Sequence, residues 1–578
     1  MEKLINNISA QKRRNAPEEV FKFESEHKED ASDDQPHQQP YSQYTLDNVF
    51  GNEPYGEPGL AYILGNWYVF LCALSSTVGG FLFGYDQGVV SITLVMDQFL
   101  TDIPDIATGH AGAGFKKGLM TALLELGAFI GAWNQGWIAD KYSRKRSIVF
   151  ALLIFIVGGS LQAAAQDYAM LTVARFIGGL GIGMLSMVAP LYISEISPPE
   201  IRGFLLVTES FAVVVGVIVA YWLTFGTRYM SGEWAWRLPF LLQLVPCLCL
   251  LAAVSFLPYS PRWLASVGRY DETLATLCKL RNLPDSDKRI RREFLEIKGE
   301  ALFQSTVTKE RHAHLLDGSL KHSIELELAS WIDCFRPGCW RRTHIGIGIM
   351  FFQQFCGINA LIYYSPTLFE NMNFNYDMQL IMSGVLNSLQ GVGCITSFFT
   401  METVGRRPLL LYGSLVMAGA HTIIAIMVGL YSDDWSAHKT EAWVSVAFLF
   451  IFMLGYACSW SPVPWALPAE IFPSSLRAKG VALTTCSNWI NNFIIGLITP
   501  PLIDGTGFGT YVFFGAFALL SFFWTYFFVP ETKGVTLEMM DTLFKDHSEL
   551  HDKEVKMSIE LELVKEELEK MGSISNKV

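Results

Sequence analysis

Charged residues inside apolar segments carry the most distinctive chemistry of this chain. Asp86 lies in GFLFGYDQGVVS (80–91), a stretch that is otherwise suited to lipid, and Glu125 lies in LLELGAF. An ionised carboxylate in the middle of a bilayer costs at least about 2.5 kcal/mol. Either a nearby cation compensates for this charge, or the carboxyl group holds a proton for part of the time.

One arginine is placed to balance these acids. Asp86 and Arg175 lie about 8 Å and about 9 Å from the outer ends of their apolar segments, so the two charges share a depth and can pair. Glu125 and Glu209 add further acids, and three carboxylates cannot all be ionised and paired with one guanidinium. An acid that is ionised beside Arg175 and protonated when the pair separates would suit a proton-coupled cycle. One alternative is a permanent ion pair that locks two helices, and another is an Arg175 that is a structural charge satisfied by backbone carbonyls. Glu125 could also cap a polar cluster with Gln135 or line an aqueous cavity.

A second polar group, in FFQQFCGINALIYYS, consists of amides and aromatic rings. Amides both donate and accept hydrogen bonds, and an aromatic ring packs on the apolar face of a sugar, so this set suits a monosaccharide. On one continuous helix, Gln353, Asn359 and Tyr363 would share a broad half of the surface, with Gln354 near its edge. The alternative is that these amides only join helices.

Membrane-spanning helices must position these residues. Of the 578 residues, 51% are hydrophobic and only 17% are charged, whereas soluble domains carry about 25% charged residues. Apolar runs of about 20 residues predict an all-α polytopic membrane protein with twelve transmembrane helices. The predicted spans are 67–91, 118–138, 148–165, 169–193, 204–225, 238–257, 344–366, 379–401, 408–430, 442–467, 481–503 and 510–529.

Lys and Arg are concentrated in one set of loops, which the positive-inside rule places in the cytoplasm. Both chain ends then lie in the cytoplasm, and the plasma membrane is the expected location.

The polar start of the chain shows no cleaved signal peptide. Nothing in its charge pattern points to nucleic acid.

The predicted organisation has five parts. They are a disordered cytoplasmic tail (1–66), a six-helix bundle (67–257), a cytoplasmic loop (258–343), a second six-helix bundle (344–529) and a cytoplasmic tail (530–578). Helical spacing with mixed charge over 272–304 predicts short amphipathic helices in the loop. Residues 549–571 are expected to form an exposed helix.

The two bundles repeat one plan. ADKYSRKR follows helix two and METVGRRP follows helix eight; Glu195 precedes Arg202 by seven residues after helix four, and Glu470 precedes Arg477 by seven after helix ten. Matched acids and bases predict ion pairs that hold one conformation closed and break in the other. The alternative is a basic face that only orients the protein. The predicted gate network consists of Asp140, Arg144, Glu195, Arg202, Arg262, Glu402, Arg406, Arg407, Glu470 and Arg477.

Six motifs occur together along residues 67–541: GRR, PLYISEISPPEIRG, SPRWL, QQFCGINALIYYSP, VPWALPAEIFPSSLRAKG and VPETKG. In combination they resemble the sugar porter family of the major facilitator superfamily. The resemblance implies a fold of two six-helix bundles with the substrate site between them near the midplane. The chain is most similar to fungal monosaccharide transporters, most of which are proton symporters.

The resemblance also implies roles for individual residues. Gln353, Gln354 and Asn359 match the ligands of the sugar hydroxyls, and Trp465 matches the aromatic plate beneath the sugar. Asp86 and Arg175 match the proton site and its partner, and we add Glu125 to the predicted proton-coupling residues because it lies at a similar depth. The full predicted substrate-binding set is Phe83, Ser210, Gln353, Gln354, Asn359, Tyr363, Gln390, Trp465 and Asn488.

Two of these positions depart from the family pattern. Relatives often carry Gln where this chain has Ser210, and Asn where it has Gln390. A shorter side chain at position 210 would enlarge the pocket or admit water. Hexose and pentose therefore both stay open as substrates.

The predicted function is import of a monosaccharide with a proton by alternating access. The cytoplasmic segments contain no phosphate loop, metal-ligand cluster or nucleophile motif, so no enzyme activity, cofactor or metal is expected. Alternatives are a passive sugar facilitator, a polyol or cyclic-acid carrier, and a non-transporting sugar sensor, although sensors tend to have longer cytoplasmic tails. Sugar, proton and lipid bilayer are the expected partners; the sequence does not fix an oligomeric state.

Overall fold

The regular elements of the chain are all helices in the part that the structure describes. This structure, a computed structural model, describes residues 46–51, 53–55, 66–107, 109–110, 112–315, 320–473, 476–533, 540, 544 and 550–575. The prediction of an all-α protein is confirmed.

The N half of the protein (Trp67–Val254) contains six spans. Their helices are α5 (Trp67–Thr93), α7 (Ala113–Tyr142), α8 (Arg144–Ala163), α9 (Tyr168–Ile196), α10 (Pro199–Thr227), and α11 (Trp234–Leu242) followed by α12 (Leu244–Val254). Helix α9 packs between α7 and α8, and α5 packs against α10. A short helix α6 (Asp97–Asp102) and the 3-10 turn η2 (Pro104–Ile106) connect α5 to α7.

The C half (Trp340–Phe528) contains six more spans, two of which are built from two helices each. Its helices are α17 (Trp340–Phe355), α18 (Ile358–Asn371), α19 (Tyr376–Val404), α20 (Arg406–Tyr431), α21 (Lys439–Cys458), α22 (Val463–Ile471), α23 (Arg477–Thr506) and α24 (Gly509–Phe528). Helix α20 packs on α21 and α24, and α17 packs on α23.

The outer faces of these helices fit a lipid environment. Eleven helical segments of the described residues are long and apolar enough to cross a bilayer. The twelfth predicted span corresponds to the long helix α7, which falls outside this set and carries charged residues at both ends. Phe150, Leu153 and Val157 on α8 are exposed along one face, and lipid is the natural cover for such a surface.

The two composite spans of the C half are broken for identifiable reasons. Between α17 and α18, Gly357 has a φ of 94°, which favours glycine because other residues lack easy access to that region. Between α21 and α22, Pro462 and Pro464 lack backbone N–H groups and interrupt the helix. The interruption near these prolines was predicted, whereas 344–366 was treated as one continuous helix, and that prediction was wrong.

Close packing of α7 on α9 sets the depth of the buried charges. A Cβ atom on Gly179 of α9 would lie 2.0 Å from the carbonyl oxygen of Leu124, so only glycine allows this approach. Leu124 is the neighbour of Glu125, and Gly179 lies one turn beyond Arg175 on α9. The small residue thus brings the helices of this acid and this arginine together.

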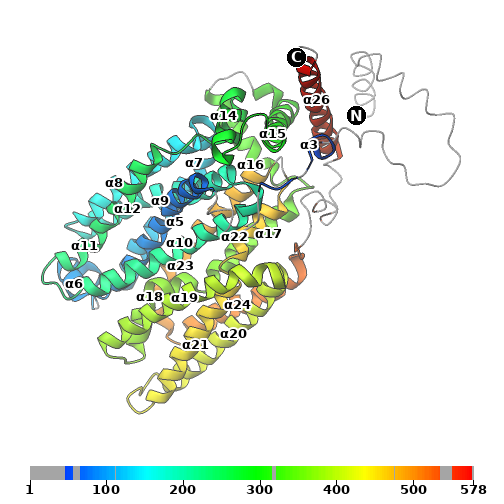
Figure 1. Cartoon of the computed structure of the whole chain (residues 1–578). Helices are drawn as coiled ribbons and strands as arrows, with labels where there is room; N and C mark the ends of the chain where they lie inside the picture. Colours follow the sequence, from blue (N-terminus) through cyan, green and yellow to red (C-terminus); the bar gives the residue numbers. More distant parts are fainter. Residues whose placement is uncertain are drawn as a thin grey trace.

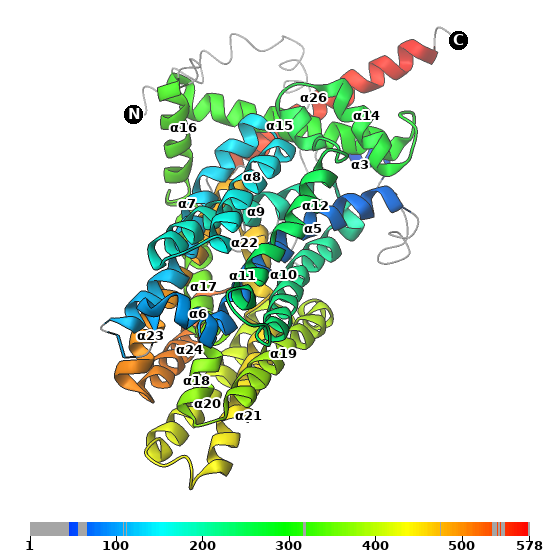
Figure 2. The same cartoon turned by 90° about the vertical axis from the view of Figure 1, so that its left-hand side faces the viewer.

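A helical cap covers one end of the bundle (Figure 1). It consists of α13 (Pro261–Ser266), α14 (Tyr270–Arg281), α15 (Lys288–His312), the turn η3 (Ala313–Leu315) and α16 (Leu320–Asp333). We call this end the cap end and the opposite end, near α6, the far end. The amphipathic helices predicted over 272–304 correspond to α14 and α15. Figure 2 shows α16 beside the cap end of α7, where Trp331 stacks on Trp133 with ring centroids 4.5 Å apart.

Both described chain ends reach the cap. Helix α3 (Leu46–Phe50) and helix α26 (Leu550–Ser575) lie beside α15 (Figure 1). Leu563 and Val564 of α26 are buried there in an apolar cluster with Phe50 and Phe294. The helix predicted over 549–571 therefore exists, but it is docked by one face and not simply exposed. Disorder was predicted for 1–66; α3 within that range is helical, and residues 1–45 lie outside the described residues.

Three helix pairs make the most extensive contacts between the two halves. Helix α7 packs on α23, α10 on α19, and α5 on α18. Near the far end, the hydroxyl of Tyr221 on α10 donates to the carbonyl oxygen of Leu380 on α19 at 2.7 Å, and Arg228 at the end of α10 forms an ion pair with Asp377 of α19. Side chains of opposite halves are thus in direct polar contact at the far end.

Candidate transport site between the two halves

Asp86 and Arg175 lie together inside the N half, as their depths predicted. Their side chains are 0% and 1% exposed, and the nearest carboxylate oxygen and guanidinium nitrogen are 3.6 Å apart. Within the described residues, neither oxygen of Asp86 accepts a hydrogen bond. Arg175 instead donates from Nε to the carbonyl oxygen of Met120 on α7 at 3.0 Å. The pair is therefore held by charge attraction without a hydrogen bond between the two groups.

Glu125 lies near this pair but takes its hydrogen bond from the other half. Its Oε1 accepts from the hydroxyl of Tyr363 on α18 at 2.6 Å, while Oε2 has no partner among the described residues. The same hydroxyl accepts from Nε2 of Gln87 at 2.9 Å and from Nδ2 of Asn492 on α23 at 3.4 Å. Tyr363 was grouped with the sugar-binding amides, yet its hydroxyl reaches the buried acids.

Gln87 and Asn492 were not among the predicted site residues. Gln87 directly follows Asp86, and Asn492 lies in CSNWINN, a cluster of polar residues within a predicted span. Polar residues in transmembrane helices usually face the protein interior. That signal was available for both residues.

The predicted sugar-binding amides form two hydrogen-bonded pairs. Nδ2 of Asn488 on α23 donates to Oε1 of Gln353 at 2.7 Å, and Nε2 of Gln353 donates to the carbonyl oxygen of Trp460 at 2.8 Å. Nδ2 of Asn359 donates to Oε1 of Gln354 at 2.5 Å, across the break between α17 and α18. All four side chains are buried. The break at Gly357, and not a shared face of one helix, brings the second pair together.

Aromatic side chains also make contacts between the two halves. Phe83 of α5 packs against Trp489 of α23 with ring centroids 4.8 Å apart, and the indole N–H of Trp489 donates to Oγ of Ser186 on α9 at 3.2 Å. Both contacts cross from one half to the other. Trp465 is half-buried on α22.

The two positions that depart from the family pattern lie on different helices. Oγ of Ser210 on α10 donates to the carbonyl oxygen of Leu206 in its own helix at 3.4 Å. On α19, Gln390 is buried and its Oε1 has no partner among the described residues. Asn387, one turn earlier, is also buried without a described partner. Asn387 was not among the predicted residues.

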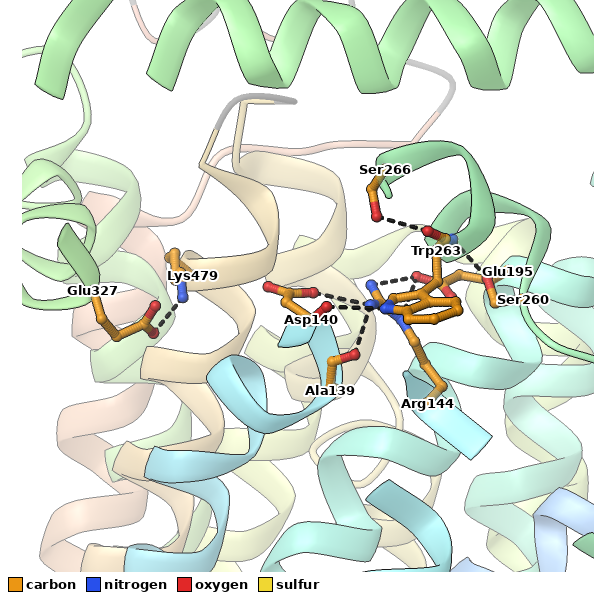
Figure 3. Close-up of polar contacts among 9 residues, drawn as sticks. All are labelled: Ala139, Asp140, Arg144, Glu195, Ser260, Trp263, Ser266, Glu327 and Lys479. Atoms are coloured by element: carbon orange, nitrogen blue, oxygen red, sulfur yellow. Dashed lines mark hydrogen bonds and ion pairs between the residues drawn. The ribbon is translucent and has the colours of Figure 1, made fainter. Parts of the chain in front are cut away.

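The predicted gate network at the cap end divides into two matching clusters. In the N half, Arg144 binds Glu195 at 2.8 Å and Asp140 at 2.9 Å (Figure 3). In the C half, Arg406 binds Glu470 at 2.7 Å. The acids thus pair with the arginine of the preceding motif, and not with the arginine seven residues later. Equivalent pairs in both halves support the internal repeat.

The remaining members of the predicted network hold backbone groups or lie outside these pairs. Arg202 and Arg477 each donate to a carbonyl oxygen five residues earlier, at 3.4 Å in both cases. Arg407 donates to the carbonyl oxygen of Tyr526 at 2.8 Å, and Arg262 is exposed. The side chain of Glu402 lies outside the described residues. Every described ion pair of the network joins residues of the same half.

Helix α16 connects to both halves at the cap end. Its Glu327 forms an ion pair with Lys479 of α23 (Figure 3), and its Trp331 stacks on Trp133 of α7. The indole N–H of Trp263 in α13 donates to the carbonyl oxygen of Asp140 at 2.9 Å, beside the Arg144 cluster (Figure 3). The cap is thus attached to the same region as the gate residues.

Comparison with known proteins agrees with this architecture. The sequence profile described as "Sugar (and other) transporter" matches residues 72–544. The chain belongs to the sugar porter family of the major facilitator superfamily. Members of this family are membrane-embedded proteins and not enzymes, and this chain is accordingly a multi-pass membrane protein.

Individual relatives cover most of this chain. A high-affinity glucose transporter of Kluyveromyces lactis is 31% identical over 83% of this chain and 85% of its own length. The high glucose sensor RGT2 of Saccharomyces cerevisiae is 32% identical over 82% of this chain but only 60% of its own length. The solved structure of the proton:xylose symporter XylE bound to 6-bromo-6-deoxy-D-glucose aligns with a TM-score of 0.66 and 26% identity, over 83% of this chain and 99% of XylE.

Proposed function

We propose that the protein imports a monosaccharide, a hexose or a pentose, together with a proton by alternating access. The observation that carries this proposal is the group of buried acids around Arg175. Asp86 and Glu125 lie close to a single guanidinium and share no hydrogen bond with it. Two buried carboxylates beside one cation favour binding of a proton at one of them, and the link from Glu125 to Tyr363 connects that site to the other half.

The sugar is proposed to bind beside these acids through the buried amides. Gln353, Gln354, Asn359 and Asn488 would exchange hydrogen bonds within their pairs for bonds to sugar hydroxyls, and Trp465 would pack on the ring. Amides suit this role because they donate and accept without the desolvation cost of charges. The remaining predicted contributors are Phe83, Ser210, Tyr363 and Gln390.

The moving units are proposed to be residues 67–257 and 344–529, linked by 258–343. The cap and both tails, 1–66 and 530–578, would lie in the cytoplasm, and the plasma membrane is the proposed location. Direct polar contacts between the halves at the far end, such as Arg228 with Asp377, support a conformation closed toward the outside. The excess of Lys and Arg in the loops at the cap end agrees with a cytoplasmic position of that end.

The test is uptake of radiolabelled sugar in yeast that lacks its own sugar transporters, with and without an uncoupler. A symporter accumulates sugar above the outside concentration, and the uncoupler abolishes that accumulation. Equilibration alone, unaffected by the uncoupler, would indicate a passive facilitator. Competition by a panel of sugars, polyols and cyclic acids identifies the substrate class.

A sugar sensor is the second candidate, because the relative RGT2 is described as a high glucose sensor. A sensor would show no uptake of any member of the panel while the protein is present at the cell surface. Uptake by the purified protein in liposomes would exclude this candidate.

A further inference from the structure

The hydroxyl of Tyr363 joins the proton site of one half to a helix of the other. Within the described residues, Tyr363 is the C-half residue whose side chain hydrogen-bonds to a buried acid of the N half. Gln87 of α5 and Asn492 of α23 donate to the same oxygen. Each of the three donor–acceptor contacts is buried. Tyr363 is thus held by both halves at once.

The Tyr363 hydroxyl, which donates to Glu125, favours one protonation state of this acid. The phenol O–H donates to Oε1 of Glu125, and a donor favours the ionised form of a carboxylate over the protonated form. The other groups that act on Glu125 are the negative Asp86 and the neutral Gln87 from α5 and the positive Arg175 from α9. All three belong to the N half. Tyr363 is the member of this set that belongs to the C half, so it leaves when the halves separate.

We infer that Tyr363 is a positioning residue through which the C half controls the proton on Glu125. When the far end is closed, as here, the Tyr363 hydroxyl stabilises the buried Glu125 carboxylate, so the O–H bond of the protonated acid breaks more readily than without Tyr363 and its proton passes to water. When the far end opens, Tyr363 withdraws and Glu125 takes a proton from the outside medium. No other bond changes and no electrons are transferred. This inference rests on the proposed function, which supplies the proton coupling.

The chain offers a matched pair of variants. Tyr363→Phe removes the hydroxyl and keeps the ring. Tyr364→Phe removes a neighbouring hydroxyl that donates at 2.8 Å to the carbonyl oxygen of Gly496, within the C half. Both tyrosines are buried on α18, so the two variants remove equal volumes from similar surroundings. Only the first removes a bond to an acid.

The readout is the ratio of net sugar accumulation to sugar exchange, measured in the same cells. Net uptake requires the empty carrier to release its proton and return, whereas exchange of labelled for unlabelled sugar does not. Tyr363→Phe is expected to lower this ratio about tenfold, because a hydrogen bond to a charged group is lost. Tyr364→Phe is expected to keep the wild-type ratio. A merely structural role of Tyr363 would lower both rates together.

Equal ratios in Tyr363→Phe and wild type would overturn the inference. If Tyr363→Phe does not reach the cell surface, Glu125→Gln decides: its ratio should fall by a similar factor, and an unchanged ratio contradicts the inference. If both single variants reach the cell surface, the double variant should lower the ratio of net accumulation to exchange no further than either single variant does. Failure of the proposed function looks different, because wild-type uptake would then be insensitive to the uncoupler.

Discussion

The buried amides that are proposed to bind sugar also form hydrogen bonds that join helices. Gln353 donates to the carbonyl oxygen of Trp460 and accepts from Asn488, so it links α17 to the α21–α22 junction and to α23. Gln354 and Asn359 bind each other across the helix break. A bound sugar would have to replace one partner in each pair, which ties substrate binding to the positions of these helices.

Replacing Gln353 with Ala should raise the half-saturating sugar concentration about tenfold, because the sugar hydroxyls lose an amide that would hydrogen-bond to them. The measurement is the concentration dependence of initial uptake rates. Gln379→Ala is the matched control: Gln379 is also a buried glutamine, and it donates to the carbonyl oxygen of Phe374 near the far end of α19. An equal rise in both variants would show that Gln353 acts only through packing.

Counting residues from segment ends correctly predicted that Asp86 and Arg175 share a depth and pair. The same counting could not find the bond between Tyr363 and Glu125. That bond depends on the rotation of α18 relative to α17, which the positive φ of Gly357 sets. It also depends on the packing of α5 against α18. Depth follows from sequence position, whereas rotation about a broken helix follows from tertiary contacts.

At the scale of helices, one buried ion pair within the cap holds the arginine that attaches the cap to the bundle. Glu293 of α15 binds Arg281 of α14 through both oxygens, at 2.6 and 2.9 Å. Arg281 also donates to the carbonyl oxygen of Ile196 at the end of α9 at 2.8 Å. Burial alone would raise the pKa of Glu293, but Arg281 and the hydroxyl of Tyr55 hold this pKa below its ordinary value of 4.5.

Glu293→Gln should therefore loosen the cap, at a cost of about 3 kcal/mol for a broken buried pair. Limited proteolysis of the 258–343 segment measures this loosening. Because the folded pKa of Glu293 lies below the unfolded one, its contribution is complete above the ordinary carboxyl range and is lost as pH falls through the folded value. The wild-type cap should stay resistant from about pH 7 to about pH 5. Loss of resistance within that range, or a resistant Glu293→Gln, contradicts this assignment.

Helix periodicity predicted the cap helices and α26 but not how α26 docks. The helical segment carries Leu563 and Val564 among many charged residues, and its sequence alone reads as solvent-exposed. Docking depends on partners far away in the chain: Arg291 and Arg311 of α15 pair with Glu567 and Asp552 of α26. Such complementarity between distant segments becomes visible only in the folded structure.

At the scale of the whole molecule, the far end is closed by contacts between the halves. Arg228 pairs with Asp377, and the indole N–H of Trp222 on α10 donates to Oγ of Ser388 on α19 at 3.3 Å. The ion pair is partly exposed, since Asp377 is 68% exposed, and such pairs contribute modestly. The closed far end is therefore held by several weak contacts that can break together.

Arg228→Glu should open the far end more often, because two acids then face each other. The measurement is the rate at which an impermeant thiol reagent labels a cysteine introduced as Ser388→Cys. We expect labelling to rise about threefold, in keeping with a pair worth under about 1 kcal/mol. Adding Asp377→Arg restores the pair with reversed charges and should return the rate to that of the Ser388→Cys protein. A rate that rises further in this variant would contradict a role for the ion pair.

Proton movement driven by sugar tests the central claim most directly. Purified protein in liposomes that contain a pH-sensitive dye is given an inward sugar gradient with no proton gradient. The buried acids predict that the wild-type protein acidifies the lumen as sugar enters, and that Asp86→Asn carries sugar down its gradient without acidification. Sugar-driven acidification that persists undiminished in Asp86→Asn would contradict a role of Asp86 in proton coupling.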